Sequence, residues 1–141
     1  MSWPYCELHQ AASARQKGAP IDLTKFTTAL RMFGKNADWC VMPDIVAGGE
    51  RSLELSLKWM RQTLDECQMG MLSVQDGMTV DMVRDLVGPR VGIFIGGSTS
   101  WKLETLPLWA ELGRERSAWC HVARVNDCIS FSVVARDESH V

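Results

Sequence analysis

Four short apolar runs divide the chain, and each one stops at turn-forming or polar residues. They cover residues 38–42, 70–74, 91–95 and 118–122. Runs of this length that are bounded by Gly, Pro and Asp are typical of strands buried on both faces, as in a parallel sheet. The pattern therefore predicts four buried strands.

Longer segments with helical spacing lie before and between these runs. The first predicted helix covers residues 20–33, begins near Asp22 or Thr24 and ends at Gly34. Its apolar side chains recur at intervals of three or four, which places them on one face. They are Leu23, Phe26, Leu30 and Phe33.

Three further helices are predicted by the same spacing. One begins near residues 49–52, and one follows Thr79 and ends at Gly88-Pro89. Another runs from Thr105 to about Arg116, with Pro107 tolerated because it falls in the first turn. The helix that begins near residues 49–52 is predicted to carry an apolar stripe of Leu53, Leu57, Met60 and Leu64.

This alternation predicts an α/β domain with a parallel sheet of about four to five strand–helix units and right-handed crossovers. The pattern fits half of an eight-stranded barrel and also a small, open, doubly wound sheet. Residues 129–135 suit either a helix or a strand, residues 1–18 are irregular, and residues 136–141 form a polar tail. We therefore expect one domain over residues 1–141.

Composition and charge exclude few classes of function. The chain is 46% hydrophobic and 23% charged, with a net charge of -2, so no global basic field indicates nucleic acid. No apolar run is long enough to span a membrane, and the first residues lack the pattern of a signal peptide. These features predict a cytoplasmic protein.

The five cysteines are odd in number and widely spaced, so we expect reduced thiols. Cys40 and Cys120 lie inside apolar runs, which favours small core residues. Cys120, His121 and Cys128 fit no standard zinc spacing. We expect no metal site and no cofactor.

Candidate chemistry gathers where the predicted strands end. Because parallel strands end at the same edge of a sheet, the residues after each strand should meet there. A carboxylate, a carboxamide and exposed glycine N–H groups in one place can read the edge of a planar heterocycle. The residues that follow the four strands are Pro43-Asp44, Gln75-Asp76-Gly77, Gly96-Gly97-Ser98-Thr99 and Arg124-Val125-Asn126.

Three other side chains near these ends extend the hypothesis. Lys102 and Arg124 could hold phosphate, and Trp101 could cover a base. Ordinary structural roles stay open: Asp44 as a helix cap, the residues around Gln75 and the two glycines as plain turns, and the two cations as solvated charges.

Five short segments follow one another along the chain: Met42-Pro-Asp-Ile-Val-Ala-Gly-Gly49, Ser52-Leu with Ser56-Leu-Lys-Trp59, Leu72-Ser-Val-Gln-Asp-Gly77, Gly92-Ile-Phe-Ile-Gly-Gly-Ser-Thr-Ser-Trp-Lys-Leu103 and His121-Val-Ala-Arg-Val-Asn126. In this order and spacing they resemble the tRNA-guanine transglycosylase superfamily, specifically its phage and bacterial branch linked to 7-deazaguanine bases in DNA. The similarity covers roughly residues 13–134.

The resemblance implies a (β/α)8 barrel that exchanges guanine for a 7-deazaguanine base in DNA or tRNA through a covalent aspartyl-nucleoside intermediate. It implies base recognition by Asp44, by Gln75 and by the backbone of Gly96 and Gly97. Asp76, Ser98, Trp101, Lys102, Arg124 and Asn126 are expected to support that site.

The chain departs from the family at the two catalytic carboxylates. The family's nucleophilic aspartate is expected beyond the fourth strand, where the chain ends at Val141. The partner carboxylate is expected before Ser13, where the chain has Glu7-Leu-His-Gln-Ala-Ala12 instead. The chain could therefore be a fragment, the product of a truncated gene, a degenerate copy or one part of a split enzyme. In each case we expect a partial barrel with two open parallel edges, in which base binding could survive where catalysis does not.

Two other functions remain open. One is an unrelated α/β enzyme that binds phosphate at the loop of residues 96–99. The other is a non-catalytic subunit that completes a barrel with a partner chain or with a second copy of itself.

Overall fold

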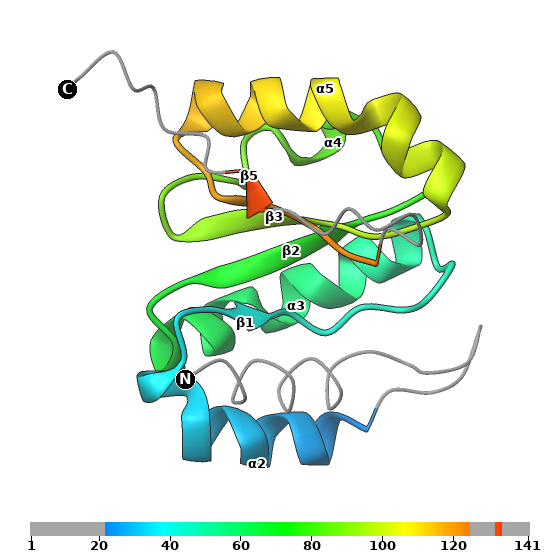
Figure 1. Ribbon diagram of the computed structural model, residues 1–141. Helices are drawn as coiled ribbons and strands as arrows, with labels where there is room; N and C mark the ends of the chain where they lie inside the picture. The colour runs from blue at the N-terminus through cyan, green and yellow to red at the C-terminus, as the bar shows by residue number, and fades with distance from the viewer. Residues whose placement is uncertain (1–21, 125–131, 134–141) are drawn as a thin grey trace, which may run out of the picture.

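The computed structural model describes residues 22–124 and 132–133, which form one sheet with helices packed against it (Figure 1). The sheet has five strands in the order β1-β2-β3-β4-β5. Neighbours from β1 to β4 pair in parallel, and β5 pairs antiparallel with β4. The strands are β1 (Cys40–Val41), β2 (Gly70–Val74), β3 (Val91–Ile95), β4 (Cys120–Val122) and β5 (Ser132–Val133).

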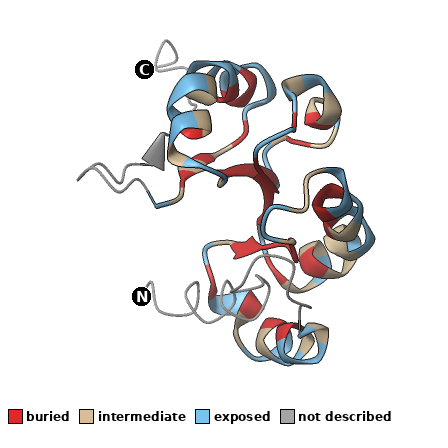
Figure 2. Ribbon diagram, turned by 90° about the vertical axis from the view of Figure 1, so that its right-hand side faces the viewer, coloured by how far each residue is buried: buried red, intermediate tan, exposed pale blue. Residues whose placement is uncertain are grey.

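The parallel strands lie side by side in chain order, which decides between the two topologies that the sequence left open. A doubly wound sheet reverses its strand order and carries helices on both faces. Here the order β1 to β4 never reverses, and the helices follow one another along one side of the strands (Figure 2). The α/β class with a parallel sheet is confirmed, and its arrangement is that of consecutive barrel units.

The fifth strand corrects the expectation of open edges. Residues 132–133 pair with His121 and Cys120 of β4 in antiparallel register. The outer edge of β4 is therefore covered at these residues, and the parallel progression stops at four strands.

The helices are α2 (Leu23–Phe33), a 3₁₀ turn η1 (Gly34–Asn36), α3 (Glu50–Glu66), α4 (Val80–Val83) and α5 (Thr99–Arg116). Asp22 caps α2 as predicted, since its side chain accepts the N–H of Lys25 at 3.0 Å. Thr79 is the N-cap residue of α4, also as predicted.

The predicted start of α5 at Thr105 is wrong. The helix begins at Thr99, because Ser98 caps it by accepting the N–H of Trp101. Pro107 therefore lies in the helix interior, where it removes one backbone hydrogen bond. Its exposed position gives the ring room on the solvent side of the helix.

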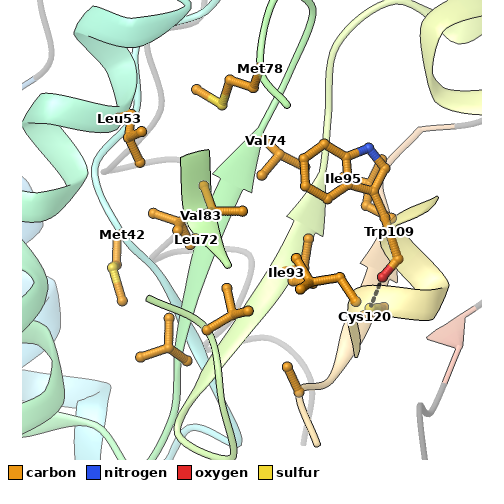
Figure 3. Packing of buried hydrophobic residues seen from close by; sticks show 14 of the residues in the cluster. Met42, Leu53, Leu72, Val74, Met78, Val83, Ile93, Ile95, Trp109 and Cys120 are labelled. Carbon is orange, nitrogen blue, oxygen red and sulfur yellow. Dashed lines mark hydrogen bonds between the residues drawn. The ribbon is translucent and has the colours of Figure 1, made fainter. Parts of the chain in front are cut away.

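The main core fills the space between the sheet and helices α3, α4 and α5 (Figure 3). We call this side of the sheet the helix face. Trp109 of α5 is 1% exposed and belongs to the same cluster as Ile93 and Ile95 of β3. Figure 3 also draws the contact between the Cys120 thiol and the Trp109 carbonyl, at 3.5 Å.

The predicted stripe on α3 is only partly right. Leu53 is buried, and Met60 and Leu64 pack against the core, but Leu57 is 41% exposed. Ser56 is fully buried at the neighbouring position, and its hydroxyl donates to the Pro43 carbonyl. A hydrogen-bonded serine can therefore occupy a core position of this helix.

The expectation of reduced thiols is wrong for one pair. Cys40 at the start of β1 forms a disulfide with Cys67 at the end of α3. Both lie in a second cluster with Phe26 and Leu30 of α2, so the bond joins strand and helix beneath α2. Cys120 is a free, buried thiol, as expected of a core residue, and burial raises its pKa to about 11.

Candidate functional site

The carboxyl ends of β1 to β4 lie at one edge of the sheet, as parallel pairing requires. We call this edge the rim and define it by Asp44, Gln75, Asp76, Gly96-Gly97 and Arg124. All of these were predicted site residues, so the structure brings the described candidates to the same edge. Asn126 and Cys128, which also entered the predictions, lie outside the described residues.

Asp44 is held in place through its two chain neighbours. The Ser56 hydroxyl donates to the Pro43 carbonyl at 2.7 Å, and the Ile45 N–H donates to the Ser52 hydroxyl at 2.9 Å. Asp44 itself is 9% exposed. Its position is therefore fixed by hydrogen bonds from α3.

These two serines were not predicted as site residues. Both are fully buried and come from the first two turns of α3. The signal in the sequence is the spacing of Ser52 and Ser56, which places two hydroxyls on one helix face beside the apolar stripe. Polar residues inside an apolar stripe need partners, and a neighbouring loop can supply them.

Gln75 joins the end of β2 to the loop that follows β1. Its side-chain amide donates to the Ile45 carbonyl at 3.0 Å, and its side-chain oxygen accepts the Gly49 N–H at 3.4 Å. The residue is 5% exposed. One donor and one acceptor of the carboxamide are thus used within the protein, and the other N–H and lone pair remain for further contacts.

Asp76 joins the end of β2 to the loop on the other side. One carboxylate oxygen accepts the Ser98 N–H and the other accepts the Ser98 hydroxyl, both at 2.7 Å. Burial alone would raise the pKa of this carboxyl, but the two Ser98 hydrogen bonds and the Lys102 charge hold the pKa below its ordinary value. Gln75 and Asp76 therefore connect the end of β2 to the loops that follow β1 and β3.

The two glycines of the third strand end have different reasons to be glycine. Gly97 has a φ of +84°, and an added Cβ would lie 2.4 Å from an Asp76 carboxylate oxygen. At Gly96 an added Cβ would meet, among the described residues, the Val74 carbonyl at 3.5 Å, which is an ordinary contact. Contacts within the protein explain Gly97, whereas no close contact among the described residues requires glycine at Gly96.

The structure contradicts the expectation that the Lys102 ammonium is a solvated charge. Its side chain is 3% exposed, and its ammonium donates to the carbonyls of Ala123 and Arg124 at the end of β4. Burial lowers its pKa, and the Arg124 charge lowers it further, against an opposing effect of Asp76. Arg124 itself is exposed, with a φ of +42°.

Trp101 lies behind the turn of the two glycines. Its ring centroid is 5.9 Å from that of Trp109, and an added Cβ on Gly97 would approach the ring to 3.0 Å. The Trp101 side chain, from the first turn of α5, therefore packs against Trp109 of the same helix, against the Gly97 turn and against the main core.

The sheet face opposite the helices carries a separate cluster of mostly aromatic side chains. We call it the aromatic face and define it by Trp39, Val41, Met71, Ser73, Phe94, Trp119 and His121. Phe94 and His121 stack with centroids 5.4 Å apart and planes 26° apart. Trp39 packs against both rings, at 6.1 and 5.3 Å. His121 is half-buried in this cluster.

Comparisons with protein-family models, curated proteins and solved structures find no match to this chain. In the part that the structure describes, no helix is long and apolar enough to cross a membrane. Residues 22–124 and 132–133 also contain no group of three or more His, Cys, Asp or Glu side chains placed to hold a metal ion.

Proposed function

We propose that this chain binds a guanine-type base, guanine or a 7-deazaguanine, at the rim of its parallel sheet. One observation carries the proposal: Gln75 links the loop of Asp44 to the end of β2, directly beside Gly96. A carboxylate, a carboxamide and a bare stretch of backbone thus come from three neighbouring strand ends. Sites in folds with parallel strands are built at this end of the strands.

The chemistry of these groups suits a guanine edge. Guanine presents two adjacent N–H donors that a carboxylate such as that of Asp44 can accept together, beside a carbonyl that accepts a hydrogen bond. Gln75 retains one N–H and one lone pair, and Gly96 has no side chain to hold a ring away from the backbone. Three kinds of group would therefore contact three parts of one planar edge.

Exchange of the base in DNA or tRNA would require a nucleophilic carboxylate and an acid–base partner in addition. Asp76 is a poor nucleophile candidate because both of its oxygens already accept from Ser98. The proposal for this chain is accordingly base recognition in a transglycosylase-like protein.

The phosphate-binding alternative is less well supported. A phosphate at the start of α5 would use the backbone N–H groups of its first turn. The Asp76 carboxylate already accepts the Ser98 N–H there, and its negative charge would repel a phosphate. Lys102, the nearest buried cation, already donates to two carbonyls.

Isothermal titration calorimetry with guanine and 7-cyano-7-deazaguanine tests the proposal. The wild-type chain should bind at least one of them, and Asp44→Ala should abolish binding. Asp81→Ala is the matched control, because Asp81 is an exposed carboxylate of α4 that pairs with Arg84. Binding that survives Asp44→Ala, or no binding to the wild type, would refute the proposal.

Gly96→Ala gives an independent test. The space around Gly96 accepts a methyl group without a clash, so the variant should unfold at the same temperature as the wild type. A base seated against this backbone would lose its contact, and its affinity should fall. Unchanged affinity would place the base elsewhere.

A further inference from the structure

Two buried polar side-chain atoms in the described part of the chain have no hydrogen-bond partner, and both belong to the aromatic face. They are the Ser73 hydroxyl and the Trp119 indole N–H. Ser73 is 2% exposed. An unpaired polar group in such a place destabilises a fold by about 1–3 kcal/mol, so its persistence indicates a partner outside the chain.

The strand register fixes the neighbours of Ser73. Ser73 pairs with Phe94, and Phe94 pairs with His121, so the three residues form one row across β2, β3 and β4. The stacked rings of Phe94 and His121 make the rest of this row flat and aromatic. A hydroxyl beside a flat aromatic surface suits a planar heterocycle with a polar edge.

The next row toward the rim contains Gln75 and Gly96, which follow the paired residues Val74 and Ile95. Side chains alternate between faces along a strand, and Gln75, directly after β2, lies two positions beyond Ser73, which is the spacing of one face. Gly96 adds no side chain to this row. The row of Ser73 therefore continues directly into the proposed base site.

We propose that Ser73 is a specificity-determining residue whose hydroxyl forms a hydrogen bond with the polar edge of a planar heterocyclic base lying on the aromatic face next to Gly96. This inference rests on the proposed function and adds one contact to the base that lies deeper in the sheet than the rim. Asp44 and Gln75 would contact the base from the rim, and Ser73 would contact it from within the sheet.

Ser73→Ala separates ligand recognition from a structural role. The free protein should unfold at the same or a higher temperature, since the variant removes an unpaired hydroxyl. Affinity for the guanine analogue bound by the wild type should fall about tenfold, the loss expected for one hydrogen bond whose partner stays unsatisfied. Ser73→Cys, of similar shape with a weaker donor, should give an intermediate affinity.

Ser56→Ala is the matched control. Its hydroxyl is equally buried but donates to the Pro43 carbonyl, so this variant should unfold at a lower temperature than the wild type. A lower unfolding temperature for Ser73→Ala, similar to that of Ser56→Ala, would assign Ser73 a structural role and overturn the inference.

Calorimetry on Ser73→Ala and Asp44→Ala distinguishes this inference from the proposed function. If Asp44→Ala loses binding and Ser73→Ala binds like the wild type, only the role of Ser73 is overturned. If Ser73→Ala weakens binding and Asp44→Ala does not, the rim site is overturned and the aromatic-face contact stands. A wild-type chain that binds neither guanine nor 7-cyano-7-deazaguanine overturns both.

Discussion

The two faces of the sheet are both well buried, but they treat their polar groups differently. On the helix face, the hydroxyls of Ser56 and Thr63 each donate to a carbonyl, and the Lys102 ammonium donates to two. On the aromatic face, Ser73 and Trp119 each leave a buried polar atom unpaired. Among the described residues, the buried side-chain polar atoms of the helix face are therefore all paired, whereas two on the equally buried aromatic face are not.

This difference suggests that the two faces have different roles. The helix face joins strands β2, β3 and β4, and Met42 after β1, to three helices through one continuous apolar cluster, which is what stability requires. The aromatic face retains hydrogen-bonding capacity that folding alone does not use. Real proteins depart from full polar satisfaction mainly at functional sites, so the aromatic face is where a ligand should be sought.

The largest expected effect is the loss of Trp109, which fills the centre of the helix face. Trp109→Ala should lower the free energy of unfolding by about 3–5 kcal/mol, because it leaves a large cavity under α5. Urea denaturation measures this, with Trp109→Phe as the milder control. A loss below about 1 kcal/mol would mean that the helix face is not the main source of stability.

Removing the disulfide tests how much the part of the helix face beneath α2 contributes to stability. The Cys40–Cys67 bond closes a loop with a sequence separation of 27 residues, and loop-closure entropy predicts a stabilisation of about 3–4 kcal/mol. Replacing both residues by serine should lower the unfolding temperature, and dithiothreitol should do the same to the wild type. If dithiothreitol has no effect on the wild type, the bond is absent in solution.

Substituting each of the two adjacent glycines compares a structural role with a ligand-binding role within one turn. Gly97→Ala should destabilise the chain by about 1–3 kcal/mol, because it combines a positive φ with a clash against the Asp76 carboxylate. Gly96→Ala should leave stability unchanged and reduce base binding only. Thermal unfolding of both variants measures the contrast, and equal losses would show that Gly96 is also structural.

Much of the helix face could be predicted from the sequence. The apolar runs of β2 and β3, and Phe26 and Leu30 of α2, are local patterns whose period matches their element. The sequence pattern misplaces the start of α5 because Pro107 favours the first turn of a helix, whereas Ser98 is the true cap. Leu57 was misplaced because a serine with a distant backbone partner replaced it in the core.

The candidate site was predicted less completely, because its bonds link residues far apart in sequence. Parallel strand ends must meet at one edge, so the positions of Asp44, Gln75 and Gly96 followed from the pattern. That Gln75 reaches Ile45, 30 residues away, and that Lys102 turns inward to β4 depend on tertiary packing. The disulfide is of the same kind, since spacing alone cannot pair two of five cysteines.

The smallest expected effect concerns Asp76, whose carboxylate joins β2 to the start of α5. Because its pKa is below the ordinary value of 3.8 in the folded chain, the folded state favours the ionised form. This contribution is fully present above the unfolded pKa and is lost as pH falls through the folded pKa. Asp76 is exposed, so solvent screens its charge and only a small effect is expected. Asp76→Asn should lower stability by at most about 1 kcal/mol near pH 7 and flatten the loss of stability below about pH 4.

Urea denaturation at pH 7 and at pH 3 measures the Asp76 effect, and Ser98→Ala supplies the double-mutant cycle. Asp76 accepts two hydrogen bonds from Ser98, so the losses from the two single variants should not add in the double variant. Additive losses would mean that the carboxylate acts independently of Ser98. In that case Asp76 would no longer be committed to the fold, and its oxygens would become available to a ligand at the rim.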